Sequence, residues 1–318
     1  MCEIDRLFPL HIRQKLSPDY MDGLEEIRIR IGQPLEFSYA KGRRYLMLRG
    51  EHYSLCGEEQ AAAAGEILYR VTGEDIAEML NYISNYSLYA YREEMKQGYI
   101  TVEGGHRIGI AGQTAVEQGK VSGMHHISFL NIRVAHERRG CAQKLLPYIR
   151  YRNSIYNTLF LSEPGAGKTT YLRDCVRILS DGEADWPGLK VCVVDERSEI
   201  AACHMGVPQN DVGSRTDVLD GCTKAEGMLM LLRSMSPQVI AVDELGGERD
   251  FWAVEQAVFS GSRVLGTVHA GEMAELSQKP FLRNWLKRQV FRRFVLIERK
   301  AGGKRGIHIF DEHMERLC

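Results

Sequence analysis

Residues 162–170, Ser-Glu-Pro-Gly-Ala-Gly-Lys-Thr-Thr, have the types and spacing of a loop that binds phosphate groups. The apolar run 158–161 precedes them, so a buried strand is expected to enter a glycine-rich turn from which a helix leaves. In such a turn the backbone N–H groups surround a phosphate, and the positive end of the helix faces it. We expect Lys168 to reach the β- and γ-phosphates of ATP and Thr169 to hold Mg²⁺. The predicted nucleotide-binding residues are Ser162, Glu163, Pro164, Gly165, Ala166, Gly167, Lys168, Thr169 and Thr170.

The loop departs from the pattern G-x-x-x-x-G-K-[ST] at its first position, where this chain has Ser162. Glycine at that position permits a backbone conformation that other residues adopt only with strain. Glu163 is also an unusual neighbour for a triphosphate. Gly165, Gly167 and Lys168 are present, so we expect the departures to affect turnover more than nucleotide binding. The alternative is a glycine-rich turn without a ligand.

The apolar run 239–242 is followed by Asp243 and Glu244, which is typical of a Walker B motif. We expect Asp243 to hold the water shell of Mg²⁺. We expect Glu244 to polarise the attacking water as general base. An exposed acidic turn after an ordinary strand is the alternative, and the phosphate loop upstream favours the Walker B interpretation.

Two further predicted strands end in residues that could take part in catalysis. Asp195 and Glu196 follow one of them, and His269 follows the other. Ligands of open α/β sheets bind at the carboxyl ends of the strands, so these side chains are expected on the nucleotide side. Asp195 or Glu196 could be the general base in place of Glu244. His269 could sense the γ-phosphate, or it could be structural.

The elements that must position these residues form a doubly wound α/β pattern after residue 157. Short Val-, Ile- and Leu-rich runs are typical of parallel strands that are covered on both faces. Helices are expected between them, at 168–180, 223–235 and 250–260. The prediction is therefore a mostly parallel sheet with helices on both faces.

A smaller α+β domain is expected at 1–140, before a second domain at 141–318. Residues 24–48 alternate in polarity, as strands do, and Thr72 is a plausible helix N-cap with Asp75 three positions later. A second helix is expected at about 87–96. The charged segment 136–153 is the best linker candidate.

Composition argues against several classes of protein. The chain has 318 residues with 41 basic and 42 acidic side chains, so it lacks the basic excess of most nucleic-acid-binding proteins. We expect no signal peptide, because the first residues have no apolar core of the kind that such peptides contain, and no apolar run is long enough to span a membrane. Eight cysteines without a C-x-x-C pair fit a reduced, cytoplasmic protein without a zinc site.

The order of these motifs resembles the Walker A, Asp box, Walker B and His box of type II/type IV secretion ATPases. The chain is also similar to one subfamily, stage III sporulation protein AA, over nearly its whole length. The stretches that carry this resemblance are 24–30, 98–101, 104–109, 131–134, 194–200, 206–209, 217–220, 224–228 and 233–237.

The resemblance implies a RecA-like, ring-forming ATPase core, expected as a hexamer, with ATP and Mg²⁺ as its ligands. It implies a cytoplasmic protein of the mother cell of a spore-forming bacterium, at the inner face of a membrane. Its work would be to power or assemble a secretion-like channel to the forespore, with a membrane platform protein as partner. In the wider family, arginines of the N-terminal domain approach the nucleotide, often across a subunit boundary, and Arg107 and Arg133 lie in the stretches of this chain that look equivalent. The alternative is that both are ordinary strand arginines that face solvent.

Two other functions remain open at this level. A RecA-like nucleic-acid motor is disfavoured by the balanced charge. A nucleotide-dependent scaffold with little turnover is supported only by the departures at Ser162 and Glu163.

Residues 281–294 place apolar side chains at helical spacing, with basic residues between them. A core helix with a solvated basic face is the simpler interpretation. The basic face could instead meet acidic lipid or an acidic loop of the platform protein. A closing hairpin is expected after it, over 293–298 and 306–310.

Overall fold

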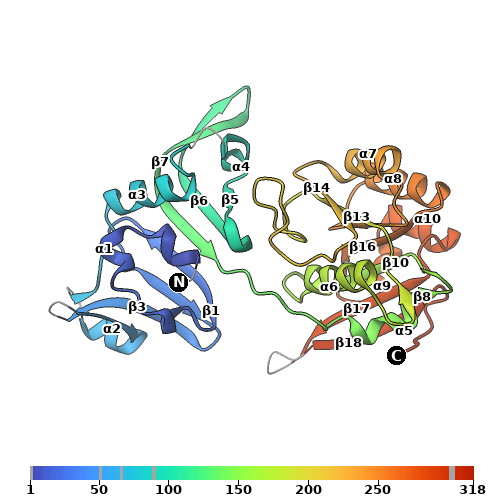
Figure 1. Cartoon of the computed structure of the whole chain (residues 1–318), viewed down its shortest axis with the longest axis horizontal. Coiled ribbons are helices and arrows are strands. Elements are labelled where there is room, and N and C mark those ends of the chain that lie inside the picture. The colour runs from blue at the N-terminus through green and yellow to red at the C-terminus, as the bar shows by residue number, and fades with distance from the viewer. Residues whose placement is uncertain (1–2, 50–51, 65–66, 88–90, 301–304) are drawn as a thin grey trace. The chain divides into compact units, whose positions relative to one another are not determined.

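The computed structural model describes the chain except residues 1–2, 50–51, 65–66, 88–90 and 301–304 (Figure 1). It divides into two compact units, unit 1 (Met1–His136) and unit 2 (Glu137–Cys318). Within the described residues, no helix has the length and apolar character needed to cross a membrane.

Unit 1 is built on a seven-stranded antiparallel sheet of order β4-β3-β2-β1-β7-β6-β5. Its strands are β1 (Leu24–Arg30), β2 (Glu36–Tyr39), β3 (Gly42–Arg49), β4 (His52–Gly57), β5 (Tyr99–Thr101), β6 (Arg107–Glu117) and β7 (Lys120–Arg133). Its helices are η1 (Glu3–Leu7), α1 (Leu10–Arg13), η2 (Pro18–Met21), α2 (Glu58–Ala64), α3 (Gly73–Ile83), α4 (Arg92–Lys96) and η5 (Glu103–Gly105).

The expected cap of the helix at residue 72 is confirmed. The Thr72 hydroxyl accepts a hydrogen bond from the Asp75 N–H, and the Asp75 carboxylate accepts one from the Thr72 N–H. This capping box satisfies two backbone donors at the start of α3. The alternation over 24–30 is confirmed as well, since Ile27 and Ile29 of β1 are buried in the core of unit 1.

Unit 2 is built on a seven-stranded sheet of order β14-β13-β15-β16-β10-β17-β18. All neighbouring pairs from β14 to β17 are parallel, and β18 is antiparallel to β17. The strands of the sheet are β10 (Thr158–Ser162), β13 (Val191–Asp195), β14 (Thr216–Asp220), β15 (Val239–Val242), β16 (Arg263–His269), β17 (Arg293–Arg299) and β18 (Arg305–Asp311). Its helices are η6 (Gln143–Leu145), α5 (Leu146–Ile149), α6 (Lys168–Asp181), α7 (Lys224–Ser234), α8 (Glu248–Phe259), α9 (Ala274–Gln278) and α10 (Pro280–Arg288). Two small antiparallel hairpins lie outside the main sheet: β8 (Arg150–Tyr151) with β9 (Ser154–Ile155), and β11 (Gly182–Glu183) with β12 (Trp186–Pro187).

Helices cover both faces of this sheet, as the apolar strands predict. Phe160 packs into a cluster with α5 and α6, whereas its neighbours Leu159 and Leu161 pack into a second cluster with α7, α8 and α10. Successive side chains of a strand point to opposite faces, so these short runs can be apolar at every position. The sheet is nevertheless mixed, because β18 runs antiparallel at its edge.

Several predicted boundaries differ from the structure. The helix expected at 87–96 is α4, Arg92–Lys96, and residues 88–90 lie outside the described part. The helix expected over 281–294 ends at Arg288, because Gln289 has a left-handed backbone with φ of 51° and β17 begins at Arg293. The closing hairpin is confirmed as β17 and β18, although its turn at 301–304 is not described.

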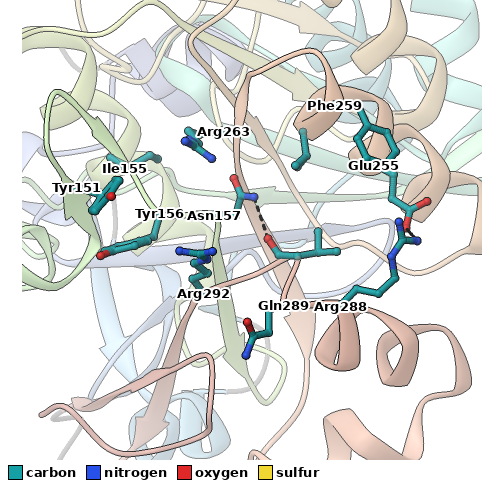
Figure 2. A pocket seen from close by; sticks show the side chains of 12 residues that line it. Tyr151, Ile155, Tyr156, Asn157, Glu255, Phe259, Arg263, Arg288, Gln289 and Arg292 are labelled. Carbon is teal, nitrogen blue, oxygen red and sulfur yellow. Dashed lines mark hydrogen bonds and ion pairs between the residues drawn. The ribbon is translucent and has the colours of Figure 1, made fainter.

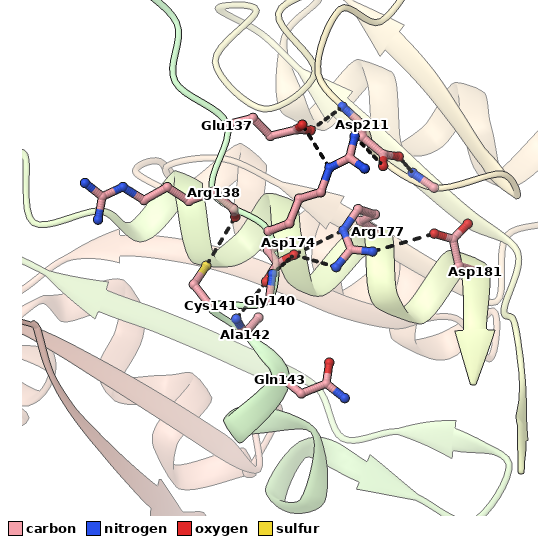
Figure 3. Close-up of polar contacts among 12 residues, drawn as sticks. Glu137, Arg138, Gly140, Cys141, Ala142, Gln143, Asp174, Arg177, Asp181 and Asp211 are labelled. Atoms are coloured by element: carbon pink, nitrogen blue, oxygen red, sulfur yellow. Dashed lines mark hydrogen bonds and ion pairs between the residues drawn. The ribbon is translucent and has the colours of Figure 1, made fainter. Parts of the chain in front are cut away.

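The segment 136–153, expected as a linker, is largely packed against unit 2. Ala142, Leu145, Leu146 and Ile149 are buried in the cluster that contains α6. Asp174 of α6 fixes the start of this segment: its carboxylate accepts hydrogen bonds from the N–H groups of Gly140 (3.0 Å) and Ala142 (2.8 Å) (Figure 3).

The Asp174 carboxylate also accepts hydrogen bonds from Arg177 at 3.1 and 2.8 Å. Burial alone would raise the pKa of Asp174, but the hydrogen bonds from Ala142, Arg177 and Gly140 outweigh it and hold that pKa below its ordinary value of 3.8. The charged carboxylate is therefore the form that stabilises the fold.

Replacing Asp174 with asparagine is expected to lower the free energy of unfolding by about 2 kcal/mol at pH 7, the usual contribution of hydrogen bonds to a charged group. A group with a depressed folded pKa stabilises above its unfolded pKa and loses that effect as pH falls through the folded value. The difference between the variant and the wild type should therefore shrink below about pH 4. Urea unfolding at pH 7 and below about pH 4 measures the difference in the free energy of unfolding, with the exposed Asp185→Asn as the matched control. An equal loss in both variants would contradict a special contribution from Asp174.

Candidate functional site

The carboxyl ends of four neighbouring parallel strands bring the predicted residues together. The strands lie in the order β13-β15-β16-β10, and Ser162 at the end of β10 is paired with His269 at the end of β16. Asp195 ends β13, and Asp243 directly follows β15. We call the residues gathered here the strand-tip site: Ser162–Thr170, Glu199, Asp243, Glu244, Thr267 and His269.

The loop after β10 has the backbone that its glycines suggest. Gly165 and Gly167 have φ values of 73° and 110°, which side chains rarely tolerate. Gly167 is the N-cap of α6, a helix of 14 residues, and the free N–H groups of its first turn face the loop. Ser162 lies outside the set of described residues with positive φ, since it still pairs as part of β10. The serine in place of glycine therefore brings no backbone strain.

Lys168, His269 and Glu244 form a continuous chain of polar contacts. The Lys168 Nζ lies 2.9 Å from His269 Nδ1 and 3.4 Å from the carbonyl oxygen of Ser162. The other ring nitrogen of His269, Nε2, lies 3.2 Å from Glu244 Oε1. Burial lowers the pKa of Lys168, and the nearby carboxylates of Asp243, Glu244 and Glu199 oppose that shift.

Asp243 is buried and tied to the strand beside it. The Thr267 hydroxyl donates to Asp243 Oδ1 at 3.0 Å, and the Glu244 N–H lies 3.0 Å from both that oxygen and Thr267 Oγ1. These contacts hold Glu244 at a φ of 22°, a conformation that is strained for a residue with a side chain. Burial raises the pKa of Asp243, and the neighbouring Glu199 raises it further.

The two acids after β13 have other partners. The Asp195 carboxylate is fully buried and accepts hydrogen bonds from the N–H groups of Glu199 (2.8 Å), Ile200 (2.9 Å) and Ala201 (2.8 Å). Burial raises the pKa of Asp195 to about 6. Glu196 forms an ion pair with Lys224 of α7. Both carboxyl groups are thus engaged in holding the loop, which argues against either as a general base.

Glu199 is an acid of this site that the motifs in the sequence did not indicate. Asp195 turns the loop so that the Glu199 carboxyl group forms a hydrogen bond with Asp243. The charge of Glu199 beside Asp243 is one cause of the raised pKa of Asp243, since like charges at short range repel. The only signal in the sequence is a third acid, four positions after Asp195.

Arg305 is a second residue that the sequence did not suggest. It is the first residue of β18, and its guanidinium group lies against the phosphate loop. A Cβ atom added to Gly167 would be 3.1 Å from the Arg305 Nε. Arg305 makes no ion pair within the described part of the chain. A cation beside the positive end of a helix is unfavourable by itself, so this arrangement favours an anion between Arg305 and α6.

Arg107 and Arg133 belong to unit 1, whereas the strand-tip site is built wholly from unit 2. They are direct partners on neighbouring strands β6 and β7. The Arg107 guanidinium stacks over the ring of Tyr99, 3.5 Å from its centroid, and Arg133 is exposed.

Comparisons with known proteins agree with this fold. A sequence profile of the family described as "Sporulation stage III, protein AA" matches residues 2–317. The protein named "Stage III sporulation protein AA" of Bacillus subtilis (strain 168) is 39% identical over 316 residues, which cover 98% of this chain and 95% of that protein. Among solved structures, the ATPase DotB of Legionella pneumophila aligns over 93% of this chain and 81% of its own, with a TM-score of 0.55 and 14% identity. The pilus retraction motor PilT with bound ADP aligns over 90% and 78%, with a TM-score of 0.54 and 12% identity.

Proposed function

The chain belongs to the family Sporulation stage III, protein AA, and from this premise we propose that it is an ATPase that binds Mg-ATP at the strand-tip site. The observation that carries the proposal is the contact chain from Lys168 through His269 to Glu244, beside the buried Asp243. These residues come from the ends of three strands, and all of them are polar. The similarity in fold to the DotB and PilT structures supports a RecA-like core.

Different residues of the strand-tip site bind different parts of a nucleoside triphosphate. The N–H groups of the loop 163–168 and the amino group of Lys168 bind the β- and γ-phosphates. Arg305 approaches from the side of Gly167 and binds phosphate oxygens that ATP and ADP share. Mg²⁺, when bound, neutralises charge on the phosphate oxygens.

The donor set fits magnesium that is held largely through water and phosphate. Among the described residues, no group of three His, Cys, Asp or Glu side chains is arranged to bind a metal ion directly. The Thr169 hydroxyl and the Asp243 carboxylate would supply oxygen ligands, the kind that Mg²⁺ prefers, and few protein ligands suffice because Mg²⁺ retains several waters.

Glu244 takes the proton of the attacking water. Its side chain is 44% exposed and so can reach a water molecule, while His269 fixes one of its oxygens. His269 contacts both Glu244 and Lys168, so it links the protonation of Glu244 to the lysine that binds the phosphates. Asp195 and Glu196 keep the loop in place and do not touch the reacting atoms.

In the cell, the protein works as a hexameric ring in the mother-cell cytoplasm, at the inner face of a membrane. It powers or assembles a secretion-like channel to the forespore through a membrane platform protein. Arg107 and Arg133 reach the nucleotide of a neighbouring subunit. The family assignment and the solved ATPase neighbours support this assignment.

Phosphate release by the purified chain in Mg-ATP tests the function. We expect release that rises more than in proportion to protein concentration, because a ring is needed to complete each site. The control omits Mg²⁺. Nucleotide binding without any release over the same concentrations would contradict the ATPase and leave a nucleotide-dependent scaffold.

A further inference from the structure

A cavity of about 310 Å³ lies at the amino ends of β10, β16 and β17, the edge of the sheet opposite to the strand-tip site (Figure 2). Its walls come from the β8–β9 hairpin and from the last turns of α8 and α10. We call it the arginine cavity, because three of its lining residues are Arg263, Arg288 and Arg292.

The arginine cavity has an excess of positive charge. Its single carboxylate, Glu255, is already paired with Arg288, as the dashed line in Figure 2 marks. Within the described residues, the side chains of Arg263 and Arg292 have no ion-pair or hydrogen-bond partner. Asn157 is not free for a ligand, since its amide bonds to the backbone of Val290 and Val264 at 2.8 and 3.0 Å. The guanidinium groups of Arg263 and Arg292 thus remain available for an anion.

Aromatic side chains extend the surface beyond the cavity. Phe259 at its rim is 72% exposed, and Trp252 on the same helix is 52% exposed. The two lie about two helical turns apart, so they face the same side of α8. Inside the cavity, the rings of Tyr151 and Tyr156 lie 4.8 Å apart, and Arg293 covers Tyr156 at 3.9 Å. These rings therefore leave no open sandwich for a nucleotide base.

We propose that the arginine cavity and the α8 face with Trp252 and Phe259 bind an acidic segment of a partner protein that also carries apolar side chains. Guanidinium groups match carboxylates in geometry and charge. Exposed aromatic residues and arginines are the types that are enriched at the centres of protein interfaces. The exposed rings of Trp252 and Phe259 extend the surface beyond what a small anion needs, and the concave shape of the cavity does not suit a flat membrane. This inference is independent of nucleotide binding at the opposite edge of the sheet.

The test is the fluorescence anisotropy of a fluorescein-labelled random copolymer of glutamate and tyrosine, titrated with the full chain. We expect Arg263→Glu/Arg292→Glu to weaken binding at least about tenfold, because two charge-assisted contacts become repulsive. The matched control is Arg215→Glu, an exposed arginine on another part of unit 2, which should bind as the wild type does. Phe259→Ser, at an exposed position, should weaken binding of this copolymer more than binding of poly-glutamate.

Three outcomes would overturn the proposal. The double variant could bind like the wild type, or Arg215→Glu could lose as much affinity, which would show general attraction to a polyanion. The double variant could also lose co-sedimentation with phosphatidylglycerol vesicles while it keeps the copolymer, which would make the surface a membrane contact. The unfolding midpoints of all variants show whether each one is folded.

Discussion

Replacing Lys168 with alanine is expected to abolish measurable binding of ATP and ADP. The amino group of Lys168 is buried at the centre of the strand-tip site, and a hydrogen bond to a charged group in such a place is worth about 3 kcal/mol. That loss alone raises Kd on the order of a hundredfold. The substitution also leaves the carboxylates of Asp243, Glu244 and Glu199 without their nearest cation, so they repel the phosphates.

Isothermal titration calorimetry with ATP and ADP measures this effect. Lys287→Ala, at an exposed position at the end of α10, is the matched control and should bind as the wild type does. Arg305→Gln gives a graded comparison, since it should weaken ATP and ADP equally, by about tenfold. Unchanged affinity in a folded Lys168→Ala protein would refute the nucleotide site.

The sequence was sufficient to predict the central strands of unit 2 and their edge. Residues 158–161, 191–194 and 239–242 are apolar throughout because both faces of the sheet are covered, and such runs are readily recognised. Polar residues at or after the carboxyl ends of parallel strands share one edge of the sheet, and the structure brings Lys168, Asp243 and His269 together there.

The residues that the sequence did not reveal depend on contacts between distant parts of the chain. β14 was missed because Thr216–Asp220 is a half-buried edge strand in which three of the five residues are polar and neither a continuous apolar run nor an alternation is present. Glu199 reaches the site only because the buried Asp195 captures three successive N–H groups of its loop. Arg305 reaches Gly167 only through the register of the last two strands. Spacing along the chain carries no signal for Arg305, and for Glu199 it offers only an acid four positions after Asp195.

The two acids closest to Asp243 can be separated by replacing each with glutamine. Glu244→Gln is expected to bind ATP normally but to slow hydrolysis about a hundredfold or more, the usual contribution of a general base. Glutamine keeps the size of the side chain and its contact with His269, but it cannot take a proton from water. Phosphate release and calorimetry together give the two quantities, and Glu248→Gln at the exposed start of α8 is the matched control.

Glu199→Gln should behave differently from Glu244→Gln. Its amide can still form a hydrogen bond with Asp243, and the substitution removes one negative charge from beside the buried Asp243 carboxylate. We therefore expect less than about a tenfold change in hydrolysis, with ATP bound somewhat more tightly because the repulsion falls. If Glu199→Gln stops turnover while Glu244→Gln does not, Glu199 is the base, and the loop that Asp195 folds serves to deliver it. If Glu244 is the base, the strained backbone at Glu244 serves to hold the catalytic carboxylate in position. If Glu199 is the base, the turn after β13 has that function.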